Sequence, residues 1–251
     1  MTKRLVIIQL YPDQMNIYGD TGNAQIICQR VRLYGYEPQL LAYNSKADLN
    51  NLLKADLVVG GGGQDSGQRA ILADLAKIKN NLLSMAAEKV PMLMICGLYQ
   101  LFGHYFRTKD GDKLDGIGLF DLVTNGSDRR LIGNAIVESD EFGELIGYEN
   151  HSGITKLNDN QAALGQIVQG YGNDGSGSDE GAMRYCVVGT YLHGPVLAKN
   201  SRLTDWLILR AVDRKYGDDK LRPADEDARA RLKSIAKLEQ LARDVAKTRS
   251  Q

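Results

Sequence analysis

Cysteine and histidine are scarce in this sequence of 251 residues, which holds three of each. The cysteines Cys28, Cys96 and Cys186 are odd in number and are not spaced as metal ligands usually are. We therefore expect no disulfide framework, and a reducing cytoplasm fits this cysteine usage best. No apolar run reaches the roughly 18 residues that a membrane span requires, and the chain opens on a strand pattern rather than a signal peptide.

An excess of charge of either sign is absent as well. The 31 lysines and arginines balance 31 aspartates and glutamates, so the formal net charge is zero. Proteins that bind nucleic acid or a membrane surface usually carry a basic excess, and neither partner is predicted here. With 43% hydrophobic and 25% charged residues, the composition is that of a globular protein with a sizeable core.

The N-terminal part of the chain alternates strand patterns with helix patterns. Apolar runs predict strands at 5–10, 39–43, 55–59 and 91–95. Apolar residues at helical spacing predict helices at 23–33 and 71–87. Strands that are apolar throughout and separated by helices indicate βαβ units around a buried parallel sheet. The predicted fold class is therefore α/β, with three layers and a mostly parallel sheet flanked by helices.

Shorter segments fill the second half of the chain. Alternating patterns predict mixed or antiparallel strands that extend the sheet, at 131–137, 143–148 and 185–191. The glycine-rich stretch 170–181 predicts a surface loop.

Two further helices are predicted near the end, at 201–214 and 225–247, and the second is dense in charged residues. We expect one domain over residues 1–218, followed by a charged helical tail over 219–251. This tail is expected to be either solvated or docked on a partner.

The segment 90–100 (VPMLMICGLYQ) combines a short apolar strand, Cys96 at its end, Gly97 directly after, and the start of a helix pattern. This order is typical of a nucleophile elbow, a sharp turn that exposes a nucleophile at the edge of a sheet. The adjacent helix N-terminus favours a thiolate over a thiol. A buried structural cysteine is the alternative at this position, and it is the expected state of Cys28 and Cys186.

The three histidines lie in different contexts. His193 follows a strand pattern at 187–192, at the edge where α/β sheets gather their chemistry, and we consider it the candidate base. A structural role is the alternative for His193. His104 is expected to be structural, on a helix two turns beyond Cys96. His151 is expected in an exposed turn and is a weaker candidate.

Four glycines, Gly60 to Gly63, follow the strand predicted at 55–59. Such a run lets backbone amides approach a ligand closely. A phosphate-binding role is disfavoured because the Lys-Ser/Thr pair of a P-loop is missing. An oxyanion hole shared with the amide of Gly97 is the functional interpretation, and a plain tight turn is an equal alternative.

Taken together, these motifs resemble the class I (triad-type) glutamine amidotransferases, in the branch that includes the amidotransferase domains of cobyric acid synthases. Within this branch, the likeness is greatest to the glutaminase subunits of lipid II isoglutaminyl synthases, and it covers about residues 5–216. The motifs that carry it lie at 16–23 (NIYGDTGN), 61–63 (GGG), 95–100 (ICGLYQ), 130–134 (RLIGN), 147–151 (GYENH), 170–173 (GYGN) and 189–195 (GTYLHGP).

The resemblance implies a covalent mechanism that hydrolyses L-glutamine. By this resemblance, Cys96 is the nucleophile and His193 is the general base and acid. Arg130 is the ligand of the substrate glutamine, and the oxyanion amides are those of Gly97 and of Gly62 or Gly63. A guanidinium suits the substrate role because its fork binds a carboxylate through two hydrogen bonds. Arg129 is the less favoured alternative to Arg130.

The resemblance also implies a partner. A Mur-ligase-like subunit (MurT type) is expected to form a heterodimer with this chain and to bind ATP and Mg²⁺, whereas this chain is expected to need no cofactor. The partner would activate the α-carboxylate of D-glutamate in lipid II. Ammonia from this chain would then convert that residue to D-isoglutamine during peptidoglycan synthesis.

Two positions depart from the family pattern. Leu98 replaces a second glycine after the nucleophile, which predicts changed packing. Many members carry a glutamate two residues after the histidine, and here that residue is Pro195. An imidazole without an orienting acid is poorly fixed in tautomer and direction, so we expect the partner to supply the carboxylate.

Three alternatives remain open on the sequence. The chain could be an amidotransferase subunit for another acceptor, such as a cobyrinic acid. It could also be a catalytically inactive scaffold subunit that keeps the fold. A cysteine peptidase without preference for glutamine is the third.

Overall fold

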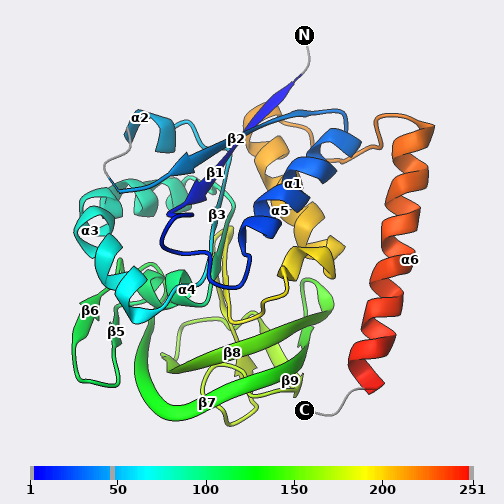
Figure 1. Ribbon diagram of the computed structural model, residues 1–251. Helices are drawn as coiled ribbons and strands as arrows, with labels where there is room; N and C mark the ends of the chain where they lie inside the picture. Colours follow the sequence, from blue (N-terminus) through cyan, green and yellow to red (C-terminus); the bar gives the residue numbers. More distant parts are fainter. Residues whose placement is uncertain (1–2, 46–48, 249–251) are drawn as a thin grey trace.

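The computed structural model describes residues 3–45 and 49–248, which form two six-stranded sheets and the helices around them (Figure 1). Residues 1–2 and 249–251, the ends of the predicted domain and tail, lie outside the described residues. Among the described helices, none combines the length and the apolar character that a membrane crossing requires.

The first sheet forms the centre of the fold. Its strands, in spatial order, are β11 (Ala182–Arg184), β12 (Val187–Thr190), β4 (Met92–Ile95), β3 (Leu57–Gly60), β1 (Arg4–Leu10) and β2 (Glu37–Tyr43). All neighbours pair in parallel except β11, which pairs antiparallel with β12. The expected α/β class with a mostly parallel sheet and a mixed extension is thus confirmed.

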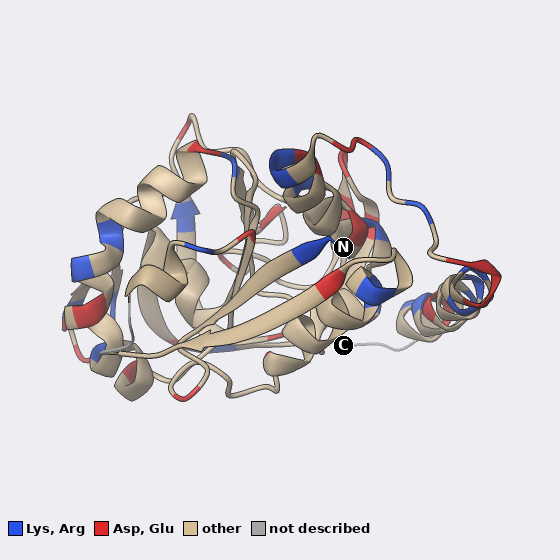
Figure 2. Cartoon of the chain, turned by 90° about the horizontal axis from the view of Figure 1, so that it is seen from above, with Lys and Arg blue, Asp and Glu red and all other residues tan. Residues whose placement is uncertain are grey.

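Helices cover both faces of this sheet, as Figure 1 shows: α1 (Thr21–Leu33) and α5 (Ser201–Tyr216) lie on one side, and α2 (Leu49–Leu52) and α3 (Asp65–Ala87) on the other. Residues of α3 at helical spacing, from Ile71 to Leu82, are buried. The strands β3, β4 and β12 carry no charged residue, in contrast to the helices and loops around them (Figure 2). Such strands are buried on both faces.

The second sheet packs below the first in Figure 1. It contains β5 (Tyr105–Arg107), β6 (Lys113–Asp115), β7 (Leu122–Ser139), β8 (Gly143–Leu157), β9 (Gly165–Gln169) and β10 (Asp179–Glu180). The segments 131–137 and 143–148, which we expected to extend the first sheet, therefore lie in a separate one. The turn between β7 and β8 is short, so these long strands pair with each other along almost their whole length.

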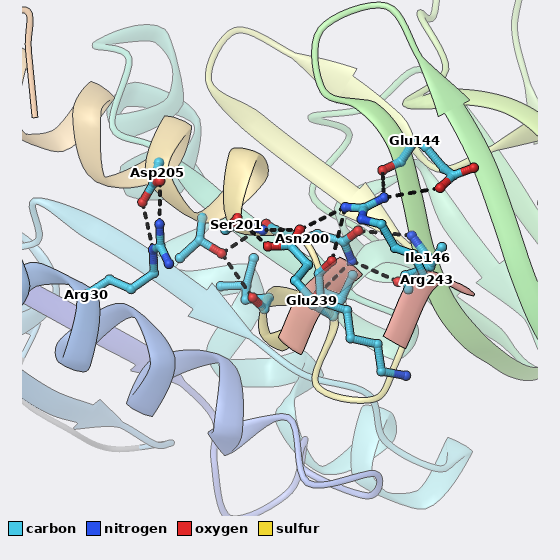
Figure 3. A network of polar contacts seen from close by, with 12 residues as sticks. Arg30, Glu144, Ile146, Asn200, Ser201, Asp205, Glu239 and Arg243 are labelled. Atoms are coloured by element: carbon cyan, nitrogen blue, oxygen red, sulfur yellow. Dashed lines mark hydrogen bonds and ion pairs between the residues drawn. The ribbon is translucent and has the colours of Figure 1, made fainter. Parts of the chain in front are cut away.

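The last helix, α6 (Glu226–Thr248), docks on the body through polar contacts, most of which Figure 3 shows. Glu239 accepts hydrogen bonds from the backbone N–H and the hydroxyl of Ser201, at the start of α5. Arg243 forms an ion pair with Glu239 and donates to the backbone carbonyls of Glu144 and Lys199. The predicted tail is therefore a helix whose C-terminal half is held by polar contacts, and Ala228 near its start is buried as well.

Candidate active site

Four parallel strands end at one edge of the first sheet, and each is followed by a segment of the site. A loop from Tyr11 to Asp20 follows β1, the glycines 61–63 follow β3, Cys96 follows β4, and His193 lies just beyond β12. In an open parallel sheet this carboxyl edge is where ligands bind. The topology therefore collects residues from four distant parts of the chain.

Cys96 lies at a strained corner between β4 and the short helix α4 (Gly97–Phe102). Its φ of 49° and ψ of −103° are unusual for a residue with a side chain, and its N–H donates to the carbonyl of Thr190 at 2.8 Å. A Cβ at Gly97 would lie 2.8 Å from Met15 Cε and 3.0 Å from the amide nitrogen of Gly63, so a larger residue would press on both neighbours. The turn thus has the backbone strain of a nucleophile elbow.

Leu98, which replaces the second glycine of the family pattern, is fully buried. Its Cδ1 lies 2.3 Å from the position of a Cβ at Gly60, and its N–H points to the carbonyl of Gly61 at 3.4 Å. The leucine therefore packs on the glycine run from behind and leaves the corner at Cys96 intact.

His193 is held beside this corner by its backbone. Its N–H donates to the carbonyl of Tyr148 in β8 at 2.8 Å, and Tyr148 donates back to the carbonyl of His193 at 3.1 Å. A Cβ at Gly62 would lie 3.1 Å from Cys96 Cβ and 3.2 Å from His193 Cε1. The thiol and the imidazole therefore converge on the same point of the glycine loop.

Asp20 is a member of this cluster that the sequence motifs did not assign. Its Oδ1 lies 3.3 Å from Nδ1 of His193, and both side chains are only 2% exposed. Burial by itself would lower the pKa of His193, but the hydrogen bond to Asp20 and the neighbouring Cys96 raise this pKa from 6.5 to about 10. The carboxylate missing at Pro195 is thus matched in space by one from the other end of the chain.

The glycine loop is bound on both sides of Gly62. The amide of Gly62 donates to Oδ2 of Asp20 at 2.7 Å, and its carbonyl accepts a hydrogen bond from the N–H of Ile17 at 3.1 Å. The amide of Gly62 is therefore already engaged. Gly63 lines the pocket described below and lies beside Gly97, so the amides of these two residues are the better placed oxyanion donors.

A pocket of about 330 Å³ opens beside Cys96, a size that suits one small ligand. Arg130 on β7 lines it, where its Nε donates to Oδ1 of Asn150 at 2.7 Å and its Nη2 to the hydroxyl of Tyr18 at 2.9 Å. The guanidinium of Arg129 lies over the ring of Tyr171 instead, 5.1 Å from its centroid. The geometry thus favours Arg130 over Arg129 as a ligand of the pocket.

The other two histidines differ from our expectations. His151 is not in an exposed turn: it lies in β8, is 4% exposed, and stacks on Tyr191 with ring centroids 3.6 Å apart. Burial lowers its pKa from 6.5 to about 4, so it is neutral at neutral pH. His104 is not on the helix after Cys96, because α4 ends at Phe102; its Nε2 contacts Asp121 at 2.8 Å.

Cys28 and Cys186 are free thiols with little exposed surface, as we expected. Cys28 lies in α1 within the hydrophobic core, and Cys186 precedes β12. Burial raises the pKa of both thiols, which keeps them protonated and unreactive. Of the three cysteines, Cys96 is the one with a histidine and a pocket beside it.

Comparison with known proteins agrees with this geometry. The family model of the CobB/CobQ-like glutamine amidotransferase domain matches residues 6–201. A subunit of the lipid II isoglutaminyl synthase (glutamine-hydrolyzing) named GatD, from Staphylococcus aureus strain N315, is 34% identical over 92% of this chain and 94% of its own length. The GatD subunit from Streptococcus pneumoniae strain ATCC BAA-255 / R6 is 35% identical over 89% of this chain and 86% of its own length.

Among solved structures, a crystal structure of a glutamine amidotransferase superposes with a TM-score of 0.58, at 12% identity, over 81% of this chain and 98% of its own. That likeness supports the fold alone, whereas the family model and the two relatives support the family. The resemblance inferred from the motifs is confirmed, and the chain belongs to the CobB/CobQ-like glutamine amidotransferases.

Proposed function

We propose that this chain is the glutaminase subunit of a lipid II isoglutaminyl synthase. The observation that carries the proposal is the convergence of Cys96 and His193 at a pocket of amino-acid size that is also lined by Arg130. The extended match to two relatives of that name supports the choice of acceptor. A site of this kind needs glutamine and water, and no group beyond the side chains and amides of the chain.

The reaction begins with glutamine bound to Arg130 through its α-carboxylate, which the guanidinium fork meets bidentately. The thiolate of Cys96 adds to the side-chain amide carbon, and the oxyanion that forms accepts hydrogen bonds from the amides of Gly63 and Gly97. Each donor of this kind contributes about 3 kcal/mol to the stability of the transition state. The helix α4 begins at Gly97, so its N-terminus also faces the thiolate.

Proton transfers fall to His193. Its imidazolium gives a proton to the amide nitrogen, the C–N bond breaks, ammonia leaves, and a γ-glutamyl thioester remains on Cys96. A water molecule then gives a proton to the imidazole and adds to the thioester. The C–S bond breaks and restores the thiolate, and the new γ-carboxyl group releases its remaining proton to water as glutamate leaves.

Ammonia has to reach an acceptor before water protonates it, so the site requires a partner docked over or near the pocket. We infer that the partner is a Mur-ligase-like subunit of the MurT type, in a heterodimer. ATP and Mg²⁺ would act there to activate the α-carboxylate of D-glutamate in lipid II. The product would be D-isoglutamine in a peptidoglycan precursor made on the cytoplasmic side.

The test is a glutaminase assay of the purified chain, alone and with the Mur-ligase-like protein of the same organism. We expect glutamate release that Cys96→Ala abolishes and that the matched control Cys28→Ala preserves, because Cys28 is a buried thiol that does not line the pocket. With lipid II, ATP and Mg²⁺ added, mass spectrometry should show a carboxylate converted to a carboxamide.

Other outcomes would contradict the proposal in distinct ways. Glutamate release without amidation of lipid II, but with amidation of a cobyrinic acid, would assign another acceptor. Full amidation by Cys96→Ala would make the chain a scaffold. Hydrolysis of peptides without preference for glutamine would make it a peptidase.

A further inference from the structure

We propose that Asp65 binds the α-ammonium group of the substrate glutamine and thereby restricts the site to the free amino acid. The proposal rests on the glutaminase function above and deepens it, because it names the feature of the substrate that the pocket selects. Asp65 is the first residue of α3, is exposed, and lines the pocket beside Cys96.

The charges of the pocket match those of a free amino acid. Within the described part of the chain, Asp65 is the one carboxylate and Arg130 the one guanidinium that line it. The thiolate of Cys96 is balanced by the neighbouring imidazolium of His193. Free glutamine carries one carboxylate and one ammonium, so Arg130 suits the first group and Asp65 the second.

The two charged side chains reach the pocket from different halves of the fold. Arg130 belongs to β7 in the second sheet, whereas Asp65 begins α3, which covers the first sheet (Figure 1). The pocket is therefore lined by elements of both halves. A substrate held there meets one charge from each of them.

The carboxylate of Asp65 is available to a ligand. It makes no hydrogen bond or ion pair with any residue in the described ranges. The acids near it differ in this respect: Asp74 of the same helix accepts the hydroxyl of Tyr11 at 2.9 Å, and Asp112 pairs with Arg69. Asp65 is thus an acid of the pocket wall whose charge no neighbour in the described chain neutralises.

A structural role for Asp65 exists beside this one. A negative charge in the first turn stabilises a helix through the macrodipole, and the N-cap residue Gln64 makes no side-chain capping bond. The same charge keeps the α-carboxylate of glutamine away from the N-terminus of α3. The α-carboxylate is therefore directed to Arg130, which leaves the ammonium on the side of Asp65.

His151 also lines the pocket but adds no positive charge that would repel an ammonium. Burial lowers its pKa to about 4, so its imidazole is neutral at neutral pH. Nδ1 donates to the carbonyl of Gly153 at 2.9 Å, which leaves a lone pair on Nε2. Nε2 is buried and has no partner among the described residues, so it offers a neutral acceptor to the same substrate.

This arrangement would select against glutamine whose amino group is acylated. In a peptide or an N-acyl derivative that nitrogen is uncharged, and the carboxylate of Asp65 would face a neutral group. Because Asp65 is exposed, the discrimination is moderate, about 5- to 30-fold. The pocket would therefore reject glutamine residues within peptides and accept the free amino acid.

The experiment measures steady-state kinetics of the full chain, alone and in the complex, with L-glutamine and with glutaramate. Glutaramate keeps the carboxylate and the carboxamide but lacks the amino group. We expect Asp65→Asn to raise KM for glutamine about 5- to 30-fold with kcat changed less than about threefold. KM for glutaramate should stay unchanged, and Asp65→Glu, which keeps the charge, should retain most of the preference for glutamine.

The matched control is Asp13→Asn. Asp13 is another exposed aspartate, and it lines the adjoining cavity but not the pocket beside Cys96. This variant should leave both KM values at the wild-type level. Thermal unfolding of each variant reports any loss of helix stability separately, because destabilisation of α3 alone would not distinguish glutamine from glutaramate.

A binding measurement removes turnover from the test. In a Cys96→Ala background, calorimetry gives Kd for both ligands, and adding Asp65→Asn should weaken glutamine alone. The proposal is overturned if Asp65→Asn keeps the wild-type preference, or if it weakens glutamine and glutaramate equally while glutamine is still hydrolysed. If the wild type releases no glutamate and Cys96→Ala binds neither ligand, alone or in the complex, the glutaminase function itself fails.

Discussion

The phenol ring of Tyr18 packs edge-on against the imidazole of His193, with ring centroids 4.5 Å apart, and the hydroxyl of Tyr18 accepts a hydrogen bond from Arg130 at 2.9 Å. One side chain thus contacts both the proposed base and the arginine that is the proposed ligand of the substrate. The loop that carries Tyr18 also carries Asp20, whose Oδ1 lies 3.3 Å from Nδ1 of the same imidazole. In the proposed reaction, this loop therefore couples binding of the substrate to orientation of the base.

Tyr18→Phe should separate these two contacts. The ring remains against His193, but Arg130 loses an acceptor, so we expect KM for glutamine to rise about 2- to 10-fold with kcat unchanged. Tyr18→Ala also removes the ring and should lower kcat as well. Steady-state kinetics of the two variants test this, and equal effects on kcat would contradict the division of roles.

Arg130→Lys should weaken glutamine binding despite the conserved charge. An ammonium cannot bind a carboxylate through the two parallel hydrogen bonds of a guanidinium, so we expect KM to rise about 10- to 100-fold. Arg129→Ala is the matched control, because Arg129 is adjacent in sequence but lies over Tyr171. A larger effect of Arg129→Ala than of Arg130→Lys would reverse the assignment.

Local sequence signals were sufficient to predict the corner at Cys96 and the parallel sheet around it. An apolar strand that leads directly into Cys96 and Gly97 has few allowed backbone conformations at the turn. The structure shows one of them, with φ of 49° at the cysteine. The position of His193 after a strand also followed from local pattern, because parallel strands end at one edge. These features depend on neighbouring residues in the chain.

Asp20, Glu149 and His151 could not be placed in the same way. Asp20 and His193 are 173 positions apart, and an aspartate before a helix reads as an ordinary cap. His151 and Glu149 lie in a segment of polar residues that resembles a turn, yet both are buried in β8. His151 stacks on Tyr191, and Glu149 accepts hydrogen bonds from the amides of Tyr171 and Gly172. These contacts join segments that are distant in the chain, and no local pattern encodes them.

Glu149 should make stability depend on pH. Burial raises its pKa from 4.5 to about 7, against the opposing hydrogen bonds from the amides of Tyr171 and Gly172. The folded state thus holds this proton more tightly than the unfolded state, so stability is lost as pH rises from 4.5 to about 7. The loss amounts to at most about 3 kcal/mol.

Glu149→Gln should remove this part of the pH dependence. Although the amide loses one backbone hydrogen bond, the free energy of unfolding of the variant relative to wild type should increase as pH rises through that interval. Urea denaturation at a series of pH values measures it, with the exposed Glu138→Gln as control. Parallel curves for wild type and Glu149→Gln would show that Glu149 does not titrate in this range.

Helix α6 should undock when Arg243 is removed. The side chains of Arg243 and Glu239 are 13% and 8% exposed, and Arg243→Ala leaves the carboxylate without its cation and two backbone carbonyls without a donor. Breaking such a pair costs about 2 to 4 kcal/mol. Limited trypsin digestion should then cleave α6 at least about tenfold faster, because cleavage follows the population of the undocked state.

Arg231→Ala is the matched control, since its ion pair with Asp227 lies on the exposed face of the same helix. Cleavage at wild-type rate in Arg243→Ala would show that the apolar contacts of α6 hold it without this clamp.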